Sequence, residues 1–80
     1  MDSPRSMKIF GYPRDRELES PMAMAEVTFV ADPRTLRELA RFLNHAADLM
    51  DKHGADFGHE HFSDFTDDGP NGGPDVIVNG

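Results

Sequence analysis

The 80-residue chain has no cysteine, and no lysine or arginine follows Lys52. The missing cysteines exclude a disulfide framework, a thiolate zinc cage and a thiol nucleophile. No apolar run approaches the roughly 18 residues of a membrane span, and the N-terminal residues lack the apolar core of a signal peptide. We therefore expect one small domain over residues 1–80, in the cytoplasm and not in a membrane, with residues 1–6 poorly ordered.

Negative charge is concentrated in the last third of the sequence. The net charge is -7, and the residues after Lys52 contribute six acids and no base. Nucleic-acid binding needs a basic stripe, so the charge pattern disfavours a nucleic-acid partner. It favours a basic protein partner, because opposite potentials steer encounter. The alternative is that the acidic surface only keeps a small protein soluble.

The strongest secondary-structure signal predicts a helix over residues 33–53. Asp32 is a favoured N-cap residue, Pro33 suits the first helical position, and Gly54 suits the position after the last turn. Between them, apolar residues recur at spacings of three and four, with charged residues on the other side. This pattern indicates an amphipathic helix with one face on the core.

Four segments predict strands, at about residues 7–12, 24–30, 57–65 and 75–79. The expected order is β-β-α-β-β, which gives an α+β fold with a four-stranded, mostly antiparallel sheet and one helix packed on one face. The other face is then open to solvent or to a partner. The order of strands stays open, and dimerisation could close an uncovered face or edge, so a homodimer is possible.

The segment from Asp56 to Asp68 combines two histidines with five acids. In a strand, His59 and His61 share one side and Phe62 lies on the other. Burying two histidines without hydrogen-bond partners costs roughly 1 to 3 kcal/mol each, so we expect Phe62 to contact the helix and the histidines to face outward. Phe10 and Tyr12 of the first strand are expected on the same open face. The candidate partner-binding residues are His59, Glu60, His61, Asp64, Asp67 and Asp68, with Phe10 and Tyr12 as apolar anchors.

A divalent-metal site is the alternative function. His59 and His61 are two residues apart, which on a strand gives about 6.5 Å between Cα atoms and lets both imidazoles reach one ion. A third ligand would have to come from Asp67, Asp68, His45 or His53, and no spacing places one of them. We therefore expect no metal and no other cofactor.

Catalysis is disfavoured by the strand geometry. Ser63, His61 and Asp64 supply the residue types of a nucleophilic triad, but on a strand Asp64 faces away from the other two. The glycines from Gly69 to Gly73 are not followed by a lysine and a helix, so they do not form a phosphate-binding loop. We expect a protein that is not an enzyme.

Three features together resemble the predicted immunity proteins of bacterial polymorphic toxin systems. They are the Asp-Pro helix start, the F-G-H-E-H-F-S-D-F segment at residues 57–65, and the closing P-D-V-I-V at residues 74–78. The most specific piece is H-E-H-F at residues 59–62. The resemblance implies a non-enzymatic cytoplasmic protein that binds and blocks a cognate toxin. The acidic C-terminal third suits that role if the toxin is basic.

Overall fold

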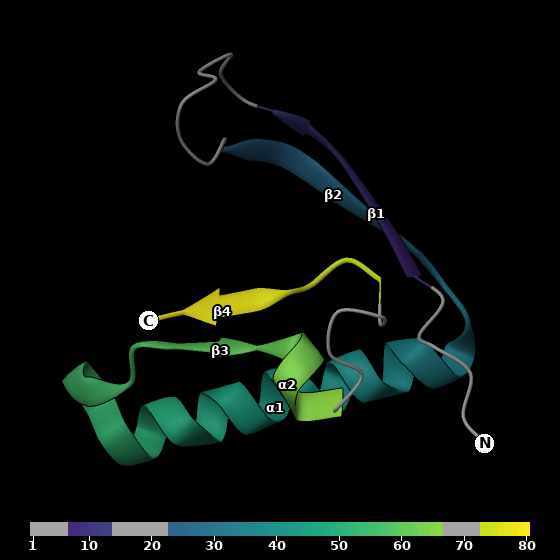
Figure 1. The fold of residues 1–80 in the computed structure, drawn as a ribbon. Coiled ribbons are helices and arrows are strands. Elements are labelled where there is room, and N and C mark those ends of the chain that lie inside the picture. The colour runs from purple at the N-terminus through teal and green to yellow at the C-terminus, as the bar shows by residue number, and fades with distance from the viewer. Residues whose placement is uncertain (1–6, 14–22, 67–72) are drawn as a thin grey trace.

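The structure, a computed structural model, describes residues 7–13, 23–66 and 73–80 (Figure 1). Residues 1–6, which we expected to be poorly ordered, lie outside these ranges. So do the candidate binding residues Asp67 and Asp68. The elements in chain order are β1 (Met7–Pro13), β2 (Met24–Ala31), α1 (Pro33–His53), the 3-10 turn η1 (Gly54–Asp56), β3 (His59–His61), α2 (Phe62–Thr66) and β4 (Ile77–Asn79).

Helix α1 occupies the residues that the capping and periodicity signals predict. The Asp32 carboxylate accepts a hydrogen bond from the Thr35 backbone N–H at 2.8 Å, so the first turn is capped as expected. At the other end, Gly54 has a φ of 54° and donates its N–H to the Met50 carbonyl. A left-handed φ favours glycine because a Cβ would clash there.

Strands β1 and β2 form an antiparallel ribbon whose register pairs Met7 with Ala31 and Tyr12 with Glu26. The strands approach closely at Gly11, where a Cβ would lie 2.8 Å from the Glu26 carbonyl oxygen and would also meet the end of the Met24 side chain. Glycine is therefore needed at this point of β1. In Figure 1 the ribbon extends away from α1 beyond its Met7 end.

The single four-stranded sheet predicted from the sequence is wrong. The described residues contain two separate two-stranded antiparallel sheets, β1–β2 and β3–β4. Strand β4 begins only at Ile77, because the residues before it bond to α2: the Val76 carbonyl accepts the Phe62 N–H at 2.8 Å. The three residues of β4 pair with β3 alone. The α+β class and the antiparallel pairing are confirmed.

The strand predicted over residues 57–65 is also wrong, because only His59–His61 is extended and Phe62–Thr66 is helical. The reason is the spacing of Phe62 and Phe65. Three residues apart, they would point to opposite faces of a strand, whereas one helical turn brings them to the same face. In the structure both rings pack on Phe42 of α1, with centroid distances of 5.4 Å and 5.7 Å. Packing against α1 therefore favours the helical turn.

The hydrophobic core lies where α1, α2 and the Met7 end of the ribbon meet. Phe42 and Phe62 are fully buried in it, together with Met7 and Leu39. Phe62 contacts the helix as the sequence predicts, although it does so from α2. Val76 and Val78 add partly buried contacts from the C-terminal segment, which places β3–β4 over α1.

Candidate functional site

The Asp75 carboxylate joins the start of β4 to β3 and α2. Its Oδ1 accepts hydrogen bonds from the backbone N–H of Ser63 at 2.8 Å and of Val76 at 2.9 Å. Its Oδ2 lies 2.8 Å from His61 Nδ1 and accepts the Ser63 hydroxyl at 3.0 Å. One side chain therefore satisfies a backbone donor in the first turn of α2 and fixes the His61 ring.

These contacts set the charge state of Asp75. Partial burial by itself raises the pKa of the carboxyl, but hydrogen bonds from His61, Ser63 and Val76 outweigh it and lower the pKa to about 2. Asp75 is therefore negatively charged at neutral pH. Its carboxylate accepts a hydrogen bond from His61 Nδ1. The other ring nitrogen, Nε2, is then the atom of His61 through which the ring can hydrogen-bond to another group.

His59 and His61 lie on the same side of β3, with ring centroids 5.0 Å apart in an edge-to-face arrangement. The register places Asn79 opposite His59 and Ile77 opposite His61, so these four side chains share one face of the β3–β4 sheet, which we call the histidine face. Ile77 is 56% exposed there. Glu60 pairs with Val78 on the other face, where Val78 packs against the core. The histidine face thus combines an apolar side chain with two imidazoles.

The arrangement does not build a nucleophile. The Ser63 hydroxyl donates to Asp75 instead of to an imidazole nitrogen, so His61 is not placed to take its proton. Asp64, the acid considered from the sequence, is exposed on α2 and is not the partner of His61.

The described residues contain no group of three or more histidine, aspartate or glutamate side chains that could hold a metal ion. His45, one of the suggested third ligands, contacts the Phe65 ring instead, in a tilted arrangement with a centroid distance of 5.3 Å. No helix in the described part of the chain is both long enough and apolar enough to cross a bilayer.

The structure brings together only part of the predicted binding surface. His59, His61 and Asp64 come from the adjacent elements β3 and α2, and Glu60 is half-buried on the opposite side of β3. Phe10 and Tyr12 are exposed on β1, which belongs to the other sheet, so the expected common face is not formed. The error follows directly from the assumption of one continuous sheet.

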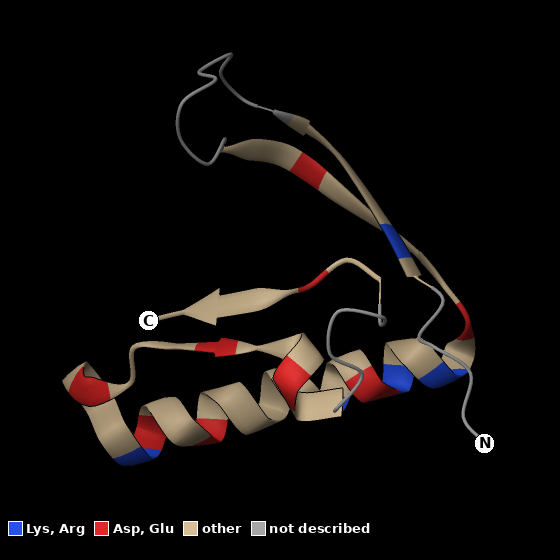
Figure 2. Cartoon of the chain, in the orientation of Figure 1, with Lys and Arg blue, Asp and Glu red and all other residues tan. Residues whose placement is uncertain are grey.

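Charge is distributed along the molecule as Figure 2 shows. The arginines Arg34, Arg37 and Arg41 lie in the first half of α1. The second half of α1 carries Asp48, Asp51 and Lys52, and the described elements after α1 carry acids without a lysine or arginine. The described acids of the C-terminal part are Asp56, Glu60, Asp64 and Asp75. The part of the chain that carries the histidine face therefore has negative charge without a lysine or arginine.

Sequence reasoning missed Asp75 and Ile77 as parts of this surface. Asp75 follows Pro74 and precedes an apolar run, a pattern that indicates a turn before a strand but not a bond to a residue 12 positions away. Because α2 was not predicted, no helix start was expected near Asp75. Only the fold brings this carboxylate to Ser63 and His61.

Comparison with known proteins identifies a family. Residues 26–80 match the family model described as Immunity protein 32. No curated protein and no solved structure matches the chain. The match covers most of the sequence and includes most of β2, all of α1 and every element after it, and it confirms the resemblance to immunity proteins.

Proposed function

This chain belongs to the Immunity protein 32 family, and on that premise we propose that it neutralises a cognate toxin in the cytoplasm by binding and occluding it. The observation that carries the proposal is the family match over residues 26–80. Membership in an immunity family implies a toxin partner and a non-catalytic role. Neutralisation then depends on the contact surface and not on chemistry performed by this chain.

The surface that we propose for the toxin is the histidine face with its acidic surroundings. It combines His59 and His61 with Ile77, which is exposed enough to act as an apolar anchor. Asp64 is exposed on α2, the element that follows β3, and Asp67 and Asp68 follow α2 in the sequence. The six acids after Lys52 favour a basic toxin, because opposite charge raises association rates and penalises wrong partners.

The surface assignment predicts that removing its side chains weakens toxin binding. The variant His59→Ala, Asp67→Ala, Asp68→Ala loses two charges and one ring, and we expect its dissociation constant to rise by roughly 10- to 100-fold. Calorimetric titration with the cognate toxin measures the change. Because part of the effect is electrostatic, the difference from the unaltered chain should shrink at high salt.

The matched control is Asp48→Ala, Asp51→Ala, which removes the same number of charges from exposed positions on α1. We expect it to bind within a few-fold of the unaltered chain. Equal loss in both variants would show that only total charge matters, and full affinity in the triple variant would refute the surface assignment.

A further inference from the structure

The β1–β2 ribbon exposes apolar side chains on both of its faces. Phe10 and Tyr12 are 57% and 68% exposed on one face, and Val27 and Phe29 are 48% and 42% exposed on the other. A two-stranded ribbon by itself is only marginally stable in water. Adding a strand to it would satisfy backbone groups and cover part of this apolar surface.

The ribbon also has open edges. It contains two strands, and no further strand in the described part of the chain pairs with either of them. Natural edge strands are usually protected by charge, proline or a bulge. In β1 these features stand at the ends, with Lys8 at one and a register shift before Pro13 at the other. The centre of β1, from Ile9 to Gly11, has none of them.

We propose that β1 pairs antiparallel with β1 of a second copy of this chain, about a two-fold axis at Phe10. The product is a four-stranded sheet in the order β2–β1–β1–β2. This inference does not rest on toxin binding. Because β1 lies outside the matched residues 26–80, family membership does not imply it either.

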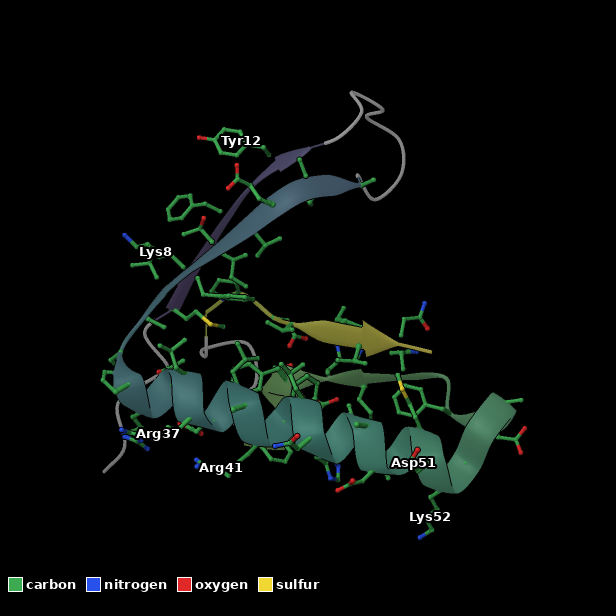
Figure 3. All side chains as sticks on the ribbon, turned by 180° about the vertical axis from the view of Figure 1, so that it is seen from behind. Lys8, Tyr12, Arg37, Arg41, Asp51 and Lys52 are labelled. Carbon is green, nitrogen blue, oxygen red and sulfur yellow. The ribbon has the colours of Figure 1, made fainter. Side chains whose placement is uncertain are left out.

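The side chains of β1 are self-complementary in this register. Phe10 of each copy lies directly opposite Phe10 of the other, and Lys8 lies opposite Tyr12. Opposed residues in an antiparallel pair have Cβ atoms about 5 Å apart, so the two phenylalanines can pack and the ammonium group can reach the tyrosine ring. Figure 3 shows Lys8 and Tyr12 projecting from the same side of the ribbon.

Charge supports the same register. Within each ribbon Tyr12 pairs with Glu26 on β2, so Glu26 is the next side chain beyond the ring that Lys8 meets. The pairing therefore brings a cation of each copy toward an acid of the other. No described acid forms an ion pair with Lys8 within one copy.

Pairing through β2 lacks this complementarity. Strand β2 contains Glu26 but no lysine or arginine, so antiparallel pairing of two β2 edges leaves the acid without an opposite charge. Repulsion between the acidic parts of two copies is limited, because the described C-terminal acids belong to elements outside the ribbon and the screening length is about 8 Å at physiological ionic strength. The β1 edge is thus the favoured site of self-association.

A charge-swap experiment on the full chain tests the two-fold axis at Phe10. In a dimer of Phe10→Lys, the two introduced lysines face each other across the two-fold axis and repel. In a dimer of Phe10→Glu, the two glutamates do the same. We expect the unaltered chain to sediment as a dimer in the micromolar range and each variant to dissociate with a dissociation constant raised roughly 10- to 100-fold. An equimolar mixture of the two variants should form the dimer again, because opposite charges then meet at the axis.

The control is Leu43→Lys on α1, where the apolar side chain is 47% exposed and the same charge is introduced. It should remain dimeric, and circular dichroism checks that all three variants are folded. If a Phe10 variant unfolds, Lys8→Glu provides the second disruption, since it repels Glu26 of the other copy.

Three results would overturn the proposal. One is a monomer at every concentration. Another is a dimer that neither Phe10 variant weakens, or that their mixture does not restore. The third is protection of the β1 backbone amides from hydrogen exchange only after toxin is added, which would assign this edge to the toxin.

Discussion

At the scale of single residues, Asp75 connects the C-terminal strand to the candidate binding surface. Its two carboxylate oxygens contact His61, Ser63 and the backbone of Val76. The same contacts that orient His61 on the histidine face also cap the start of α2. Changes at Asp75 should therefore affect stability and binding together, whereas changes at His59 should affect binding with little effect on stability.

The lowered pKa of Asp75 predicts a specific pH dependence of stability. The pKa falls from its ordinary value of 3.8 to about 2 in the folded protein, so the ionised carboxylate stabilises the fold above pH 3.8. This contribution decreases as the pH falls through 3.8 and is lost below about pH 2. We expect Asp75→Asn to reduce the free energy of unfolding by about 1–2 kcal/mol at neutral pH, allowing for partial exposure of the group.

Urea denaturation at a series of pH values measures this effect. The difference between Asp75→Asn and the unaltered chain should shrink steadily from pH 4 to pH 2. Asp64→Asn, an exposed acid on α2, is the matched control and should change stability little. A difference between the Asp75 variant and the unaltered chain that stays constant with pH would contradict the hydrogen-bonding account.

At the scale of elements, α1 could be predicted from the sequence because its signals are local. Asp32, Pro33 and Gly54 mark its two ends, and its apolar spacing needs no knowledge of the rest of the fold. The segment 57–65 could not be predicted in this way, because its conformation depends on Phe42, which lies far away in the sequence. The division of the strands into two sheets was equally out of reach, since alternation identifies a strand but not all of its neighbours.

The start of α1 offers a direct stability prediction. The Asp32 carboxylate accepts a hydrogen bond from the Thr35 N–H, and hydrogen bonding to Thr35 lowers the pKa of the Asp32 carboxyl. Replacing it by alanine leaves that backbone donor without its partner, and the loss of an N-cap side chain destabilises a helix. We expect Asp32→Ala to lower the midpoint of urea denaturation, and Asp32→Ser to recover most of the loss. Equal stability of the alanine variant and the unaltered chain would show that the cap contributes nothing.

At the scale of the whole molecule, the fold is less compact than a typical domain of this chain length. Its radius of gyration is 13.9 Å, whereas a compact domain of this length has about 12 Å. The ribbon accounts for this, because only its Met7 end joins the core while Phe10, Tyr12 and Phe29 remain exposed. The molecule therefore presents two separate surfaces, the β1 edge that we propose for a second copy and the histidine face that we propose for the toxin.

The most direct test of the central claim is a titration of the cognate toxin's activity with this protein. If the chain neutralises by occlusion, activity should fall linearly with added protein and end near one chain per toxin molecule, since occlusion requires a stoichiometric complex. The triple variant of His59, Asp67 and Asp68 should need a clear excess to reach the same inhibition. Full toxin activity in the presence of excess unaltered protein would contradict the account.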